Sequence, residues 1–276
     1  MGVIEENPVS KPYYGNWVSL KRIRQTFTVF MAFAAAAALL FVFGPQNAGI
    51  IVLEALTVFI CALSLAAAIY FIYTRKLLSP EGADIQNKIT ALVLDHIKWN
   101  GEGKALDIGC GSGALVVSIA KRFPEARVTG ADYWGGSWEY AKRQCEKNAA
   151  LEGVAERTDF VQASASKLPF ADGAFDLVVS NLTFHEVKDA RDKRLLLKEA
   201  LRAVKPGGYF VLQDLFNIRP YFGEIDGLLA LMREWGAREV FFEDTSKSIF
   251  IPRALKLAFM AGTIGMIYGR KNNSMS

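Results

Sequence analysis

The stretch Leu106-Asp107-Ile108-Gly109-Cys110-Gly111-Ser112-Gly113 joins a short apolar run, which starts at Lys104, to a segment with apolar residues at helical spacing from Ala114. An acid ends the apolar run and three alternating glycines follow, so the pattern predicts a strand, a tight turn and a helix. Glycine suits such a turn because it adopts positive φ and lets the main chain approach a ligand without a Cβ. The stretch therefore predicts an α/β fold that holds an adenosine-containing cofactor.

Two classes of cofactor are compatible with this turn. Gly109, Gly111 and Ala114 fit the G-x-G-x-x-G/A fingerprint of dinucleotide sites, and Asp132 follows about 20 residues on, where a ribose-binding acid is expected. Taken alone, the turn leaves a nicotinamide dinucleotide open. The rest of the chain separates the two classes.

Further motifs follow the glycine turn in a fixed order. They are Val128-Thr129-Gly130-Ala131-Asp132, Leu168-Pro169-Phe170, Phe175-Asp176-Leu177-Val178-Val179-Ser180-Asn181 and Val204-Lys205-Pro206-Gly207-Gly208-Tyr209-Phe210-Val211-Leu212. Together with the glycine turn, these motifs resemble the class I S-adenosylmethionine-dependent methyltransferases, and the resemblance covers roughly residues 83 to 271. It implies a Rossmann-like sheet with helices on both faces, a seventh strand inserted antiparallel between the fifth and sixth, and S-adenosylmethionine as cofactor.

Four polar residues are expected where strands end. Ligands of open α/β sheets bind outside the carboxyl ends of the strands, and Asp107, Asp132, Asn181 and Asp214 fall near such ends. A carboxylate at Asp132 can accept from both ribose hydroxyls, and Asp107 is available to the methionine ammonium. The alternative is that these acids only cap helices. The resemblance favours cofactor roles for both acids, with close main-chain approach at Gly109, Gly111 and Gly113.

The adenine end of the site departs from the family. After the strand expected at Phe160-Val161-Gln162, similar proteins often carry Gly-Asp-Ala, whose acid accepts from the adenine amino group, whereas this chain has Ala163-Ser164-Ala165. A Ser164 hydroxyl can accept the same hydrogen bond without charge assistance, and main-chain groups at Ala165 can share the role. Tyr133 directly follows the ribose acid and is expected either to flank the adenine ring or to fill a helix start.

One histidine is a candidate base. Methyl transfer requires positioned reactants and excluded water, with no protein nucleophile. His185 follows the fourth strand and can take a proton from the acceptor, although a structural role beside a helix start is equally compatible with its place. His96 lies before the sheet and is a weaker candidate. The three cysteines have no metal-ligand or disulfide spacing, so no metal is expected.

The N-terminal part is apolar. No charged residue occurs between Thr26 and Phe43, and only Glu54 occurs between Ala48 and Tyr73, so each segment is long enough to cross a hydrocarbon core of about 30 Å. Lys21, Arg22 and Arg24 precede the first segment, while Arg75 and Lys76 follow the second. The positive-inside rule then puts both ends in the cytoplasm. A cleaved signal peptide is the alternative for the first segment, but its apolar run exceeds the usual 7 to 15 residues.

These patterns divide the chain into an N-terminal cytoplasmic segment (1–25), a two-helix transmembrane hairpin (26–73), a linker (74–82), a methyltransferase domain (83–271) and a tail (272–276). Residues 249–260 can be read as a short amphipathic helix that rests on anionic lipid, or alternatively as a connection packed on the sheet between the last two strands. The net charge of +4 without a basic stripe argues against a nucleic-acid partner. We expect a membrane-anchored methyltransferase acting on a lipid or lipophilic small molecule, or alternatively a non-catalytic S-adenosylmethionine-binding membrane subunit.

Overall fold

The computed structural model describes residues 11–45, 47–134 and 139–273. The chain folds into two compact units. One unit runs from Asn16 to Lys88, and the other combines the segment that ends at Gly15 with the chain from Ile89 onward. The first unit is mainly helical, and the second is built around a β-sheet.

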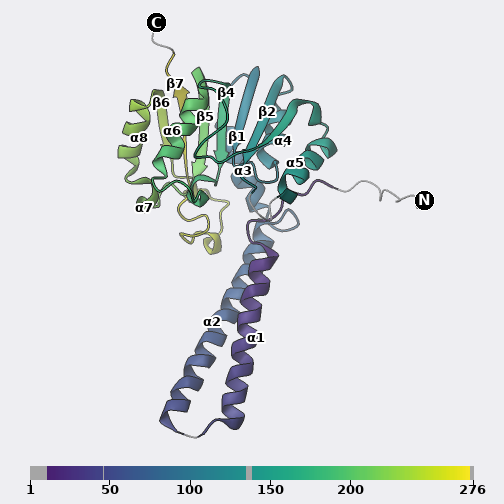
Figure 1. Cartoon of the computed structure of the whole chain (residues 1–276), viewed down its shortest axis with the longest axis vertical. Helices are drawn as coiled ribbons and strands as arrows, with labels where there is room; N and C mark the ends of the chain where they lie inside the picture. The colour runs from purple at the N-terminus through teal and green to yellow at the C-terminus, as the bar shows by residue number, and fades with distance from the viewer. Residues whose placement is uncertain (1–10, 46, 135–138, 274–276) are drawn as a thin grey trace, which may run out of the picture. The chain divides into compact units, whose positions relative to one another are not determined.

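The first unit is a helical hairpin made of α1 (Leu20–Phe43) and α2 (Ala48–Leu78), which lie side by side (Figure 1). Side-chain caps begin both helices, since Ser19 accepts from the main-chain N–H of Arg22 and Asn47 from that of Ile50. Both helices are long and apolar enough to cross a membrane. Their most apolar 18-residue windows are 0% and 11% buried, so they do not resemble the core helices of a soluble domain.

A seven-stranded sheet forms the centre of the second unit (Figure 1). Along the sheet the order is β3-β2-β1-β4-β5-β7-β6. Only β7 runs antiparallel to its neighbours, β5 and β6. This inserted strand confirms the topology that the family resemblance implied. The strands are β1 (Gly103–Ile108), β2 (Ala126–Asp132), β3 (Thr158–Gln162), β4 (Phe175–Asn181), β5 (Val204–Asp214), β6 (Ala237–Glu243) and β7 (Gly265–Lys271).

Helices cover both faces of this sheet (Figure 1). Neighbouring residues in a strand point to opposite faces, so Leu106 and Val178 join one apolar cluster while Ala105 and Val179 join the other. The first cluster includes side chains of α6 (Arg194–Ala203) and α8 (Ile225–Glu234), and the second includes side chains of α3 (Ile85–Asp95), α4 (Ala114–Arg122) and α5 (Glu139–Leu151). The short α7 (Arg219–Phe222) precedes α8. The predicted three-layer α/β class is confirmed.

The short helix predicted as one reading of residues 249–260 is not formed, and the segment is a connection between β6 and β7 with two buried side chains, as in the alternative reading. This segment forms one short 3-10 turn, η5 (Arg253–Leu255), followed by further turns. Pro252 has no N–H to donate to a helix, and the chain folds back instead, with the N–H of Ala261 donating to the carbonyl of Leu255. Ile251 and Leu255 are buried, whereas Phe259, expected on the same apolar side, is 62% exposed.

Candidate active site at the carboxyl ends of the strands

The four polar residues predicted at strand ends lie along one edge of the sheet. Strand β1 pairs in parallel with β2 and β4, and β4 pairs in parallel with β5, so their carboxyl ends meet at the same edge (Figure 1). Asp132, Asn181 and Asp214 end β2, β4 and β5, and Asp107 is the penultimate residue of β1. Parallel pairing therefore brings together residues that lie as far apart in the sequence as Asp107 and Asp214.

The three glycines after β1 all adopt the left-handed conformation that the sequence predicted. Their φ angles are 74° at Gly109, 54° at Gly111 and 84° at Gly113, the last capping the start of α4. A Cβ on Gly109 would lie 2.0 Å from Oγ1 of Thr183, whereas one on Gly111 would meet nothing within 4 Å. The turn thus needs Gly109 for packing, and it leaves open space beside Gly111.

Asp132 is fixed by main-chain donors. Its Oδ2 accepts from the N–H of Gly111 at 2.8 Å and its Oδ1 from the N–H of Trp134 at 3.1 Å. A carboxylate has about four acceptor sites, so two remain for the ribose hydroxyls. Tyr133 is 67% exposed, which leaves its ring available to a ligand, while Trp134 is buried and donates from Nε1 to the carbonyl of Gly111.

Asp107 has the opposite environment. It is buried, and its Oδ1 is one of four buried side-chain oxygens without a hydrogen-bond partner among the described residues. Burial, reinforced by the charge of Asp132, raises the pKa of Asp107 to about 8. An orphaned carboxyl oxygen in a buried position is compensated when a cationic ligand reaches it. The arrangement fits the methionine ammonium predicted for this residue.

The predicted adenine contact Ser164 lies in a small polar cluster. Its hydroxyl donates to Oδ2 of Asp189 at 2.8 Å, and the hydroxyl of Ser166 donates to the same oxygen at 2.7 Å. These hydrogen bonds, that of Ser166 being the stronger influence, lower the pKa of Asp189. Ala165 between the two serines is buried. Sequence reasoning missed Asp189, which comes from the loop after β4.

Asn181 is engaged in the scaffold. Its Oδ1 accepts from Nε2 of Gln213 at 2.8 Å, and its Nδ2 donates to Oγ1 of Thr90 at 3.2 Å. Nε2 of Gln213 also donates to the carbonyl of Ile89 at 3.1 Å. These bonds connect the ends of β4 and β5 to α3. Asn181 thus lies at the predicted edge, with its amide occupied by neighbouring elements.

His185 forms a hydrogen-bonded pair with Asp214. It lies in the 3-10 turn η3 (Phe184–Glu186), and its Nδ1 is 2.7 Å from Oδ1 of the fully buried Asp214. Asp214 also accepts from the N–H groups of Phe184 and Leu215. Burial lowers the pKa of His185, but the hydrogen bond and charge of Asp214 outweigh it, so the net pKa is raised. A proton on Nδ1 leaves the Nε2 lone pair for a reaction partner.

A segment near the N-terminus also reaches the glycine turn, which the sequence did not indicate. The buried Asn148 of α5 accepts from the N–H of Tyr13 at 2.9 Å and donates to the carbonyls of Tyr13 and Ser112 at 2.8 and 3.0 Å. The hydroxyl of Ser112 donates to the carbonyl of Tyr14 at 2.8 Å. Residues 11–15, which we call the N-terminal strap, are thereby bonded to the middle of the cofactor turn.

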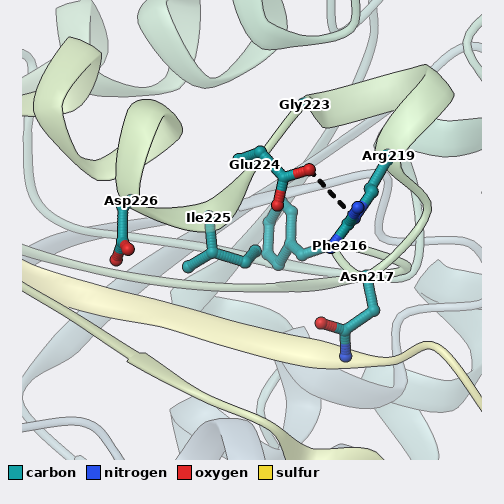
Figure 2. A pocket seen from close by; sticks show the side chains of 7 residues that line it. All are labelled: Phe216, Asn217, Arg219, Gly223, Glu224, Ile225 and Asp226. Carbon is teal, nitrogen blue, oxygen red and sulfur yellow. Dashed lines mark ion pairs between the residues drawn. The ribbon is translucent and has the colours of Figure 1, made fainter.

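A small hollow of about 170 Å³ lies beside the end of β5 (Figure 2). An ion pair between Nε of Arg219 and Oε1 of Glu224, 3.0 Å apart, lies at this hollow (Figure 2). The lining residues are Phe216, Asn217, Arg219, Gly223, Glu224, Ile225 and Asp226, and they include none of the predicted site residues. The volume is below the usual range of about 300 to 1,000 Å³ for small-molecule sites, so the hollow is too small for the whole cofactor.

Comparison with known proteins agrees with this geometry. Residues 106–212, which span β1 to β5, match the family described as methyltransferase domain. This region is a class I S-adenosylmethionine-dependent methyltransferase domain. S-adenosylmethionine is accordingly its cofactor, and the nicotinamide alternative is not supported. The acceptor oxygens of Asp107 and Asp132 fit that molecule, since Oδ1 of Asp107 has no partner among the described residues and suits an ammonium, while Asp132 has acceptor sites left for hydroxyls.

Two curated relatives illustrate the similarity of the methyltransferase domain. The release factor glutamine methyltransferase of Chlorobaculum tepidum is 33% identical over 186 residues, which cover 62% of this chain and 62% of that protein. The ubiquinone/menaquinone biosynthesis C-methyltransferase of Desulfotalea psychrophila is 32% identical over 48% of this chain and 52% of that protein. The chain thus spans between half and two thirds of the length of these relatives.

Solved structures share the fold. The [4+2]-cyclase SpnF has a TM-score of 0.54 at 19% identity and covers 68% of this chain and 81% of its own. The Haemonchus contortus phospholethanolamine N-methyltransferase 2 has a TM-score of 0.52 at 15% identity, over 72% of this chain and 55% of its own. Because a cyclase and a methyltransferase share this fold, the fold alone does not define the reaction.

Proposed function

We propose that the protein is a membrane-anchored enzyme that transfers a methyl group from S-adenosylmethionine to a lipid or lipophilic small molecule at the cytoplasmic membrane face. The observation that carries the reaction is the sheet edge of the methyltransferase domain. There, three features lie at the ends of neighbouring strands: a buried carboxyl whose Oδ1 has no partner among the described residues (Asp107), a carboxylate fixed by main-chain N–H groups (Asp132) and a histidine–aspartate pair (His185 with Asp214). The first two groups are suited to cofactor binding, and the histidine–aspartate pair is suited to proton removal.

The bound cofactor supplies an electrophilic methyl group on a sulfonium centre. Asp107 would hold its ammonium and Asp132 its ribose. His185 would take the proton that the acceptor loses when the acceptor's electron pair receives the methyl group. Asp214 holds Nδ1–H at 2.7 Å and thus fixes Nε2 as the basic atom. Its carboxylate also stabilises the resulting imidazolium.

The membrane assignment rests on the hairpin. Exposed apolar side chains occur along both helices, for example Phe41 and Phe59, and the helix lengths of 24 and 31 residues exceed the roughly 20 residues that a span needs. The basic residues on the outer flanks favour cytoplasmic termini. Reporter fusions at Asn16 and Ser276 test this topology. Both are expected to report cytoplasm, and ends on opposite sides would mean that one helix does not span.

A lipophilic acceptor is favoured by two independent observations. Relatives include the quinone C-methyltransferase of Desulfotalea psychrophila and a sterol 4-C-methyltransferase of Caenorhabditis elegans, 28% identical over 51% of this chain and 40% of that protein. In addition, the segment between β6 and β7 exposes Ile249, Leu257 and Phe259 at the sheet edge that carries Asp107. Exposed apolar residues beside cations are typical of contact with anionic lipid.

Methylation activity in lipid of defined charge tests the lipid contact of this segment. Arg253 and Lys256 are exposed on it, and basic residues at an anionic membrane surface contribute about 1 kcal/mol each. The double variant Arg253→Glu with Lys256→Glu is expected to lower methylation of a membrane-embedded acceptor much more than cofactor affinity. Wild-type protein in anionic nanodiscs should also be more active than in neutral ones. Equal activity in both, with no effect of the substitutions, would assign the segment to the scaffold alone.

Turnover is the decisive test of the proposed reaction. Detergent-purified full-length protein is incubated with methyl-labelled S-adenosylmethionine and a total membrane extract, and the labelled product is identified. Label is expected in the lipid-soluble fraction. His185→Gln should reduce the rate by about a hundredfold or more with cofactor affinity retained, whereas His96→Gln is the matched control. Cofactor binding without any turnover would instead support the non-catalytic membrane subunit.

A further inference from the structure

We propose that Asp189 supplies the acidic acceptor for the adenine amino group, in place of the acid that residue 164 lacks. The inference rests on the proposed use of S-adenosylmethionine and adds a cofactor-binding residue to it. It also assigns a ligand to a carboxylate that lies in a loop, outside every motif of the domain.

The position of Asp189 follows from the sheet. Strand β3 is the neighbour of β2, with Gln162 paired to Asp132, and the N–H of Ala163 donates to the carbonyl of Asp132 at 2.8 Å. If Asp132 holds the ribose, the base attached to that ribose meets the residues that follow β3. Those residues are 163 to 166, which include both serines. Asp189 thus reaches the adenine end of the cofactor from the loop after β4.

The contacts around Asp189 converge on one oxygen. Hydroxyls of Ser164 and Ser166 both donate to Oδ2, at 2.8 and 2.7 Å, and the two hydroxyl oxygens are 2.9 Å apart. The N–H of Ser166 also donates to Oγ of Ser164 at 3.2 Å. These bonds span up to 25 residues of sequence and hold an otherwise exposed carboxylate over the turn after β3. Its place is therefore defined before any ligand arrives.

This geometry restores the charge that a serine alone does not provide. Both serines donate their single hydroxyl proton to the carboxylate. These bonds favour the negatively charged form of Asp189, in agreement with its lowered pKa. Two donors leave about two of its four acceptor sites unused. An amino group that donates to a carboxylate forms a charge-assisted bond, roughly twice as strong as a neutral one. The cluster is accordingly suited to a purine with an amino group.

The test compares two ligands that differ at that amino group. S-adenosylhomocysteine and S-inosylhomocysteine are titrated calorimetrically into the detergent-purified full-length protein. The wild type is expected to prefer the adenosyl ligand by tenfold or more, a ratio that corresponds to about 1.4 kcal/mol. Asp189→Asn should weaken the affinity for the adenosyl ligand about tenfold and should change the affinity for the inosyl ligand little. Asp192→Asn, on the same loop, is the matched control and should leave both affinities unchanged.

A second pair of variants separates ligand recognition from loop structure. Ser164→Asp in the Asp189→Asn background returns an acid to the turn and is expected to restore the preference for the adenosyl ligand. Ser164→Asp alone places two carboxylates together and should not improve binding. Equal losses for both ligands in Asp189→Asn, or no loss, would overturn the role of Asp189. A wild type that binds neither ligand would instead overturn the proposed use of the cofactor.

Discussion

The ends of β1 and β2 each carry an aspartate, but the two side chains differ in burial and in hydrogen bonding. Asp132 is partly exposed and accepts two main-chain N–H groups, so its carboxylate is held in place without a ligand. Asp107 is buried, and its Oδ1 lacks a partner among the described residues. Asp132 is therefore ordered before a ligand binds, while Asp107 destabilises the free protein when it ionises. In the proposed site the cofactor would therefore supply the missing partner of Asp107 at the β1 end, and it would bind to an already ordered carboxylate at the β2 end.

The largest effect on stability is expected from the glycine turn after β1, where the N–H of Gly111 donates to Asp132 at the end of β2. Gly109→Ala combines a positive φ with a Cβ only 2.0 Å from Oγ1 of Thr183, a side chain that itself donates to the carbonyl of Ile108. Overpacking and backbone strain together should lower the free energy of unfolding by about 3 kcal/mol. Gly111→Ala has only the strain and should cost about 1 kcal/mol. Thermal unfolding of both variants measures the difference, and equal stability would contradict it.

Replacing each acid by its amide should affect the two strand ends differently. Asp107→Asn removes the charge for the ammonium and should weaken S-adenosylmethionine binding by about a hundredfold, while the free protein keeps or gains stability above pH 8. Asp132→Asn turns an amide donor toward a main-chain N–H and should destabilise the free protein by about 1 kcal/mol or more. Asp132→Ala should weaken the cofactor ten- to hundredfold.

Calorimetry and thermal unfolding are the paired measurements for these variants. The comparison fails if both amide variants lose stability equally in the free state. Unchanged affinity in folded Asp132→Ala would remove the ribose assignment, and it would leave the assignment of Asp107 standing. The two acids are thus tested independently.

The pH dependence of binding should report Asp107 alone. Its pKa is raised from 3.8 to about 8, so the folded protein retains a proton there that the unfolded chain has lost. The corresponding stability is present below the unfolded pKa and is lost as pH rises through 8. A cationic ligand needs the ionised form, so affinity should fall about tenfold per pH unit well below 8. Calorimetric titrations at three pH values measure this slope. The affinity of the Asp107→Asn variant should not change with pH over the same range.

The sequence predicts those parts of the site that are formed by residues close together in the chain. The glycine turn and the strand-end acids follow from short motifs, because a strand's last residues and positive-φ positions are set by neighbours in the chain. Asp189 and Asn148 carry no such signal, since they contact partners 23 to 135 residues away in the sequence. The pairing of His185 with Asp214 depends likewise on the register of β4 and β5. The helix considered for residues 249–260 is not formed, because Pro252 lacks an N–H and the chain folds back, with the N–H of Ala261 donating to the carbonyl of Leu255.

The smallest effect is expected where the N-terminal strap meets the turn. Asp132 restrains Gly111 from one side, and Asn148 together with Tyr14 restrains Ser112 from the other. The strap thus gives the turn a second support, independent of the β2 end. Removing it should loosen the turn without removing any group that contacts the cofactor in the proposed site.

Asn148→Ala removes the side chain that bonds the strap and the turn together. It leaves the N–H of Tyr13 and two carbonyls without their present partner, so cofactor affinity should fall a few-fold and stability by about 1 to 2 kcal/mol. Gln144→Ala is the matched control, because it removes one neighbour of Asn148 and keeps the strap. Deleting residues 1–15 should reproduce the loss of affinity. A deletion that binds S-adenosylmethionine as tightly as the full chain would show that the strap does not support the turn, and that contacts such as those of Asp132 and Trp134 with Gly111 hold it without the strap.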